Sequence, residues 1–192
     1  MDADGVTLAC ATAAEARAGR RTGARTALIG LGAANGIPEG PLVSFGLAGA
    51  LRDDLAAGTV LDATRVVDGD GSVLWEGGPI GVAGALQGTV LAADAIVDDA
   101  EDRRRLHERT GADAVDLESG SLARTGRLHG VLRAISDTPS RQLNGMATGV
   151  KRDGSYDWAG LARTFARHPR GFVRTARAAR HALAQLERSW AP

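Results

Sequence analysis

The sequence predicts a single α/β domain in which a mixed β-sheet is flanked by helices. Short apolar runs alternate with helical segments between residues 6 and 136, the pattern of an α/β sheet. The chain has 192 residues, of which 44% are hydrophobic, enough for one domain with a sizeable core. Few helices separate the early strands, which favours a mixed sheet over a purely parallel one. One domain spans 1–192, and two helices occupy 155–192.

The first half of the chain is predicted to be rich in strands. Apolar runs predict strands at 6–11, 26–31, 41–45, 60–67, 72–75 and 82–91. A short, poorly capped helix is expected at 13–21, and a loop at 32–40, where Gly and Pro cluster. The small residues of 46–51 predict a tight turn, and the Asp-Gly-Asp-Gly sequence at 68–71 predicts a hairpin turn.

The second half is predicted to be mostly helical. A polar helix at 98–109 begins with acidic residues and continues with arginines, as the helix dipole favours. A short strand at 114–117 leads into a helix at 118–128, and 131–136 is apolar apart from Arg133, which predicts a buried strand. After a polar loop at 138–155, helices follow at 157–167 and 169–190, the second with a proline in its first turn.

Composition excludes several classes of protein. The 23 basic and 23 acidic residues cancel, so a nucleic-acid partner is not expected. The single Cys10 rules out a disulfide framework and predicts a buried core residue, and the four histidines lack metal-ligand spacing, so no metal is expected. The short acidic N-terminus is no signal peptide and no apolar run reaches about 18 residues, so we expect a cytoplasmic protein.

A small-residue segment and a buried-strand terminus are the first candidate site elements. In Ser44–Leu51, glycines after a strand would let backbone N–H groups approach a ligand, although a plain strand exit explains them too. Asp137 follows the strand at 131–136, where α/β sheets bind ligands, and burial would suit it to act as a general acid. Arg133 within that strand requires a carboxylate partner.

Two further carboxylates are candidates. Glu118 stands where an apolar strand ends and could accept paired hydrogen bonds from vicinal ribose hydroxyls. Asp116 and Ser119 beside it are explained equally well as helix N-caps. Glu15, after the first strand, could activate water or be an ordinary solvated charge of a helix.

Taken in order, these segments resemble the nucleoside phosphorylase and nucleosidase superfamily. The resemblance rests on Glu15 and on the segments SFGLAGALRDDLAAGTVLDATRVVD, GTVLAADAIVDD, AVDLESGSLAR and VLRAISD, which cover most of residues 6–140. Within the superfamily the phrase LVSFGLAGAL and the tail from ISDTPS to HALAQL look like hopanoid-associated phosphorylases. Such enzymes imply a nucleoside phosphorylase-like fold and cleavage of a purine nucleoside without a cofactor.

The resemblance assigns a role to each matching position. Asp137 would protonate the purine with help from Ser136 and Arg133, and Glu118 would hold the ribose hydroxyls. Glu15 would activate water, after a shift of one residue in register. The remaining substrate-binding positions implied are Asp116, Leu117, Ala48, Gly49, Ile96 and Val97. Beside the resemblance, phosphate as a possible co-substrate needs backbone amides or cations: the segment Gly46–Gly49 offers amides, and Arg17, Arg20 or Arg21 is the candidate cation.

The chain also departs from this family. Leu47 stands where many relatives have serine, Leu117 replaces a methionine and Asp116 a glutamate. The segments 31–42 and 68–88 are short, which suits either an open pocket for a bulky 5′ substituent or a loss of activity.

The last helix carries an apolar stripe and a basic face. Residues at spacings of three and four form the stripe, namely Phe172, Ala176, Ala179, Leu183, Leu186 and Trp190. From Asp157 onward, 7 arginines stand against 2 acidic residues. A helix packed on the sheet explains this pattern, and a peripheral contact with anionic lipid explains it too.

The resemblance implies an enzyme that cleaves the N-glycosidic bond of an adenine nucleoside. The main prediction is phosphorolysis of adenosylhopane to adenine and a ribosyl-1-phosphate product in hopanoid side-chain synthesis. Two alternatives stay open: hydrolysis of methylthioadenosine or S-adenosylhomocysteine, and a shortened relative that binds nucleosides without cleaving them. The resemblance further implies a homodimer or higher oligomer.

Overall fold

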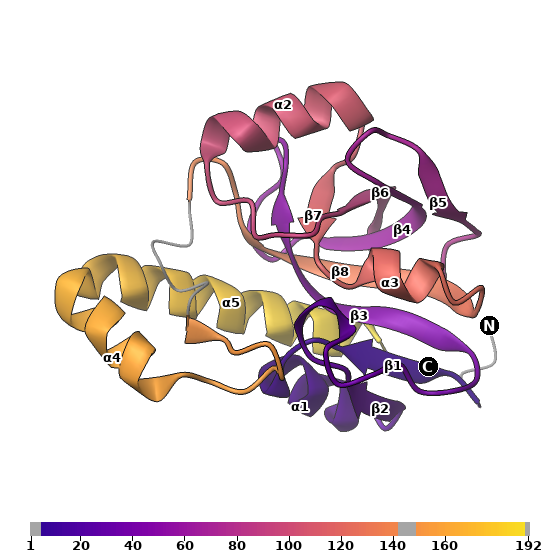
Figure 1. Ribbon diagram of the computed structural model, residues 1–192, viewed down its shortest axis with the longest axis horizontal. Coiled ribbons are helices and arrows are strands. Elements are labelled where there is room, and N and C mark those ends of the chain that lie inside the picture. The colour runs from indigo at the N-terminus through magenta and orange to yellow at the C-terminus, as the bar shows by residue number, and fades with distance from the viewer. Residues whose placement is uncertain (1–4, 142–148, 191–192) are drawn as a thin grey trace.

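The computed structural model describes residues 5–141 and 149–190, and in these ranges an eight-stranded sheet is surrounded by helices (Figure 1). The strands are β1 (Thr7–Cys10), β2 (Arg25–Leu28), β3 (Leu42–Ala50), β4 (Val60–Val67), β5 (Val73–Glu76), β6 (Leu86–Ala92), β7 (Ala114–Asp116) and β8 (Leu128–Asp137). The helices are α1 (Ala13–Arg21), α2 (Ala100–Thr110), α3 (Ser119–Ala123), α4 (Trp158–Arg167) and α5 (Pro169–Ser189), with a 3-10 turn η1 at Leu31–Ala33. The predicted mixed α/β fold is confirmed.

The strand pairings close into a ring. Strand order is β2-β1-β3-β7-β6-β4-β5, and β8 pairs with both β3 and β4. Strands β3, β7, β6, β4 and β8 therefore form a closed five-stranded barrel, from which β1, β2 and β5 extend. The pairs β3–β8, β4–β6 and β6–β7 are parallel, whereas β3–β7 and β4–β8 are antiparallel.

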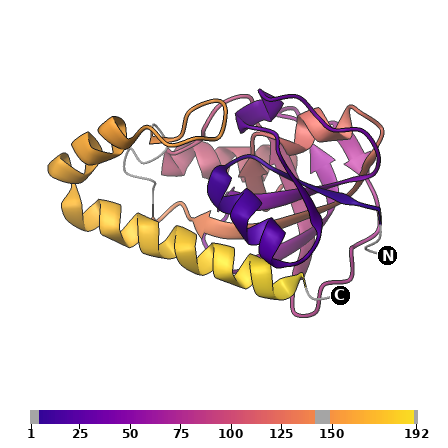
Figure 2. The ribbon, with the colours of Figure 1, turned by 90° about the horizontal axis from the view of Figure 1, so that it is seen from below.

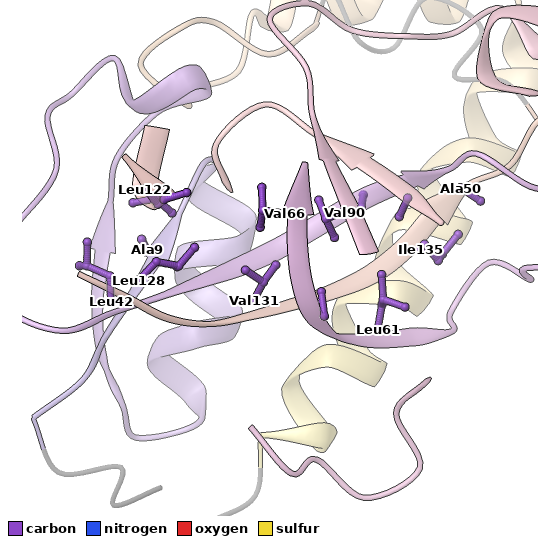
Figure 3. Close-up of a cluster of buried hydrophobic side chains, with 14 of the residues drawn as sticks. Ala9, Leu42, Ala50, Leu61, Val66, Val90, Leu122, Leu128, Val131 and Ile135 are labelled. Carbon is purple, nitrogen blue, oxygen red and sulfur yellow. The ribbon is translucent and has the colours of Figure 1, made fainter. Parts of the chain in front are cut away.

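Small and branched side chains fill this ring. Val66, Val90, Val131 and Ile135 are fully buried and point toward one another between the strands (Figure 3). A barrel of five strands is narrow, so alanines fill positions that larger residues would overpack. These alanines are Ala48, Ala50, Ala63 and Ala114.

Helix α5 runs along the outside of the sheet, and its second half is packed against it (Figures 1 and 2). Ala182 and Leu186 are fully buried, and the ring of Trp190 meets that of Phe45 edge-on at a centroid distance of 6.1 Å. Helix α4 and the first turns of α5 project beyond the sheet. No helix in residues 5–141 or 149–190 is long and apolar enough to cross a membrane.

The structure corrects three sequence predictions. The segment 46–51 is no tight turn, because β3 continues through Ala50 and pairs with β8 along its length. Helix α1 is well capped, since Thr12 and Glu15 form a reciprocal capping box. The helix expected at 118–128 is only the short α3, because β8 already begins at Leu128. In the predicted loop 138–155, and in the tail that carries the hopanoid resemblance, 142–148 lie outside the described residues.

Candidate active site

A cavity of about 640 Å³ opens where the strand ends meet the C-terminal helices. The ends of β1, β3, β7 and β8 supply its inner wall, and α5 with the segment 150–158 supplies its outer wall. Most predicted site residues line it: Glu15, Ala48, Gly49, Ile96, Val97, Asp116, Leu117, Glu118, Ser136 and Asp137. The parallel strands β3 and β8 end side by side, with Gly49 opposite Asp137, and β1 ends alongside the middle of β3. This arrangement brings residues far apart in the sequence into one site.

Asp137 is a buried carboxyl at the end of β8 with a donor on each oxygen. The Ser136 hydroxyl donates to Oδ1 at 2.5 Å, and the Arg103 guanidinium forms an ion pair with Oδ2. Burial raises the pKa of Asp137, against the opposing effects of Arg103 and Ser136. Its ability to hold a proton is what a general acid requires.

Glu118 is the second buried carboxyl of the cavity. Its Oε1 accepts a hydrogen bond from the backbone N–H of Gly32 at 3.1 Å, and its Oε2 lies 3.6 Å from Arg133. Burial raises the pKa of Glu118 to about 8, because Arg133 offsets only part of the desolvation and Asp116 and Glu15 add repulsion. The short segment 31–42 therefore reaches the site through Gly32.

Arg133 lies beneath the cavity and organises the acids above it. Its Nη2 lies 2.5 Å from Asp116 Oδ2 and donates to the Ser44 hydroxyl at 2.6 Å. This confirms the predicted buried ion pair. Asp116 also accepts hydrogen bonds from the backbone N–H and the hydroxyl of Ser119. The N-cap position of α3 is nevertheless Glu118, so neither Asp116 nor Ser119 is the N-cap that the sequence suggested. Asp116 is thus occupied by protein partners, whereas Glu118 has the longer, weaker contact with the cation.

Glu15 is buried and not a solvated helix charge. One carboxylate oxygen accepts from the backbone N–H and hydroxyl of Thr12 at 2.8 and 2.9 Å. The other accepts from the backbone N–H of Leu47 at 2.7 Å. The carboxylate is therefore held rigidly at the cavity wall by α1 and β3.

The proposed phosphate-binding residues do not meet at this cavity. Arg17 is exposed and is not among the residues that line it. Gly46 is buried under the Glu15 carboxylate and Arg133, and a Cβ there would lie 2.5 Å from either side chain. The cations that do line the cavity are Arg103 and Arg180.

The sequence interpretation missed two groups of cavity residues. The sequence presents Arg103 only as one of the arginines of the polar helix at 98–109, and its burial has no counterpart in the sequence pattern. The outer wall is supplied by Val150, Tyr156, Trp158, Thr175, Ala176, Ala179 and Leu183. Of these, Ala176, Ala179 and Leu183 belong to the apolar stripe predicted for the last helix. Their spacing does not reveal that the stripe covers a cavity.

Within 5–141 and 149–190, no three His, Cys, Asp or Glu side chains are grouped so that they could hold a metal ion. Cys10 is buried in β1, as predicted, and burial raises the pKa of its thiol.

No protein-family model matches the sequence, and no curated protein matches it. Among solved structures, the 5′-methylthioadenosine/S-adenosylhomocysteine nucleosidase of Helicobacter pylori superposes with a TM-score of 0.58 at 17% identity, over 96% of each chain. The Campylobacter jejuni enzyme of that name gives 0.54 at 15% identity, over 96% of this chain and 99% of that one.

A futalosine hydrolase mutant of H. pylori gives a TM-score of 0.54 at 16% identity, over 68% of this chain and 89% of that one. At these identities the likeness establishes the fold. The chain has the nucleoside phosphorylase/nucleosidase fold of these neighbours.

Proposed function

We propose that this protein cleaves the N-glycosidic bond of an adenine nucleoside by hydrolysis. The observation that carries the proposal is the pairing of two buried carboxyls, Asp137 and Glu118, in one cavity, both with a raised pKa. Structurally similar nucleosidases support it, one of which has been solved with 5′-methylthioadenosine in its active site.

In this proposal Asp137 is the general acid. Its proton passes to N7 of the purine while the C1′–N9 bond breaks, so that the electron pair leaves with a neutral adenine. Ser136 fixes the carboxyl, and Ile96 and Val97 form the wall beside the base. Glu118 binds the ribose hydroxyls and, in its ionised form, stabilises the positive charge that develops on the sugar, while Leu117, Ala48 and Gly49 lie against the ribose.

Water is the nucleophile that the cavity favours. The fixed carboxylate of Glu15 can accept a proton from water as its oxygen bonds to C1′, which yields the free sugar. A phosphate ion would instead need amides and cations at the cavity wall. Of the residues predicted for it, Gly46 is covered and Arg17 lies outside the cavity, and of the two arginines on the wall Arg103 is paired with Asp137.

Phosphorolysis of a nucleoside with a long apolar 5′ substituent, such as adenosylhopane, is the second candidate. The observation that favours it is the outer wall, where Val150, Tyr156, Trp158, Ala176 and Leu183 offer an apolar surface open to solvent. A hydrophobic chain could lie there beyond the ribose.

The deciding experiment follows adenine release with and without phosphate. Its substrates are 5′-methylthioadenosine, S-adenosylhomocysteine and adenine nucleosides with long alkyl 5′ groups. We expect phosphate-independent release. Release that requires phosphate and the long apolar group would establish the second candidate. Adenine binding without release from any nucleoside would make the protein a non-catalytic binder.

Replacing the acid tests its role within the reaction. Asp137→Ala should lower kcat at least about a hundredfold, because it removes the proton donor. The control is Asp54→Ala, which removes an exposed carboxylate outside the cavity. A rate near that of the wild type in Asp137→Ala would reject the assignment.

A further inference from the structure

Arg103 is a buried cation on a helix that is otherwise solvated. Among the eleven residues of α2, all described, it alone is buried, and its side chain is 1% exposed. A buried charge is costly unless paired, so its partners indicate what it does. Those partners lie outside α2, and two of them, Val97 and Asp137, line the cavity.

Three segments hold the Arg103 guanidinium in a fixed orientation. Nε donates to the carbonyl of Val97 at 2.9 Å, and Nη1 donates to the carbonyl of Ala50 at 3.3 Å. Nη2 forms the ion pair with Asp137 and lies 3.8 Å from the carboxylate of Asp98. The planar fork thus spans the segment before α2 and the ends of β3 and β8.

Gly49 makes room for this ion pair. A Cβ at position 49 would lie 3.0 Å from Asp137 Oδ2 and 3.2 Å from Arg103 Nη2. With a side chain at position 49, Asp137 or Arg103 would have to shift by a few tenths of an ångström. The small residue on β3 and the buried arginine on α2 are therefore parts of one arrangement around Asp137.

The effect of Arg103 on Asp137 opposes that of burial. Burial raises the pKa of Asp137, Arg103 and Ser136 lower it, and Asp98 raises it again. Glu15, Glu118 and Arg180 line the same cavity from α1, the end of β7 and α5. An acid works best when its pKa lies near the working pH, so a buried carboxyl benefits from a cation that limits the effect of burial.

We propose that Arg103 is the positioning residue of the general acid: it orients the Asp137 carboxyl through one oxygen and sets the pH range in which that group donates its proton. This inference rests on the proposed function. It adds a residue from α2 to the site at the ends of β8 and β3, and it gives α2 a role in the reaction.

The test compares pH profiles of kcat/KM for adenine release. In Arg103→Gln the alkaline limb should move up by about one to three pH units, because Asp137 keeps its proton longer without the cation. kcat should fall about tenfold or more, since the carboxyl loses its orientation. Arg103→Lys keeps the charge and should hold the limb close to that of the wild type. Arg104→Gln, which removes an exposed arginine paired with Asp53, is the matched control.

A second variant guards against misfolding of Arg103→Gln. Asp98 is partly exposed, and Asp98→Asn removes a negative charge that raises the pKa of Asp137, so the limb should move to lower pH. If the alkaline limb of the kcat/KM profile lies at the wild-type pH in both Arg103→Gln and Asp98→Asn, the inference is overturned. If Arg103→Gln does not fold, an unmoved limb in Asp98→Asn overturns it.

A titration separates this inference from the proposed function. The carbon-13 signal of the Asp137 carboxyl, assigned by its loss in Asp137→Asn, is followed against pH in the wild type and each variant. A higher midpoint in Arg103→Gln supports the role of Arg103 even if the wild type releases no adenine, in which case the proposed function alone fails. If the wild type releases adenine but the titration midpoint of Asp137 is the same in the wild type and the variants, only the proposed role of Arg103 is rejected.

Discussion

The carboxyl of Glu118 lies where the nearest cation, Arg133, is already paired with Asp116. Its pKa in the folded protein is about 8, above its ordinary value of 4.5. Between these pH values the folded protein keeps a proton that the unfolded chain releases. The free energy of unfolding should therefore fall as pH rises through this window, by on the order of a few kcal/mol.

Glu118→Gln tests this linkage, because a neutral amide has no proton to keep. The variant should be more stable than the wild type at pH 8, should approach it near pH 4.5, and should lose adenine release. Urea unfolding at both pH values gives the free energies. If the free energy of unfolding changes equally with pH in the wild type and the variant, the prediction is contradicted.

The sequence predicts the carboxyls of the site better than it predicts their partners. Asp137 and Glu118 are identifiable because each follows an apolar strand, where open α/β sheets bind ligands. Arg103 is not, because its burial depends on a contact with Asp137 across 34 positions of the chain, and its neighbours on α2 are ordinary solvated charges. Local periodicity carries no signal of such a contact.

At the scale of elements, Asp62 of β4 anchors the segment between β5 and β6. Its buried carboxylate accepts hydrogen bonds from the backbone N–H groups of Ile80, Gly81 and Val82 at 2.9, 2.8 and 3.2 Å. Asp62→Ala leaves three donors without this acceptor and should lower the free energy of unfolding by about 3 kcal/mol. Chemical denaturation measures this loss, with the exposed Asp70→Ala as control. If Asp62→Ala loses no more free energy of unfolding than the control, Asp62 does not anchor this segment.

The two faces of α5 have different surroundings. In the apolar stripe, Leu186 and Trp190 pack on the sheet, and Ala176, Ala179 and Leu183 line the cavity, so these residues are not free for lipid. The opposite face exposes arginines beside Phe165 and Val173 around a shallow hollow, namely Arg170, Arg174 and Arg177. The proposed contact with anionic lipid therefore belongs to this basic face.

Sedimentation with vesicles tests that contact. The wild type should sediment with vesicles that contain phosphatidylserine more than with pure phosphatidylcholine, and less in high salt. Changing the three arginines of the basic face to glutamine should abolish the difference. Changing Arg21 of α1 and Arg25 of β2, which are exposed and lie outside α5, serves as control. Equal sedimentation with both kinds of vesicle would exclude the contact.

The strand β3 shows where element prediction fails. Glycine and alanine at 46–50 predict a turn from composition, but Gly46 and Gly49 occupy strand positions against Glu15 and against the Asp137 ion pair. Their small size serves close approach of side chains from other elements. Only those tertiary contacts distinguish a glycine-rich strand from a turn.

For the whole molecule, the fold class can be predicted from the alternation of apolar runs and helices in the sequence. The closure of five strands into a barrel cannot be predicted in this way. Closure requires β8 to pair with β3 and also with β4, which are joined to it by long stretches of chain. Such pairings depend on which strands meet after folding and leave no local pattern.

The expected homodimer or higher oligomer remains a prediction. Light scattering coupled to size exclusion should give a mass at least twice that of the 19.8 kDa chain. Large apolar side chains on the surface, Val73 and Leu86 among them, are candidates for such an interface. A monomeric mass at the concentrations used for activity measurements would contradict the prediction.

The closed ring has a consequence for heat inactivation. Strands β3, β7 and β8 carry Gly49, Asp116 and Asp137 and are each hydrogen-bonded on both sides, so none can fray alone. Their amides should exchange with solvent only when the whole ring opens, whereas those of α4, outside the sheet, should exchange early. Catalytic capacity and global structure should therefore be lost at the same temperature, and the projecting helix can loosen well below it.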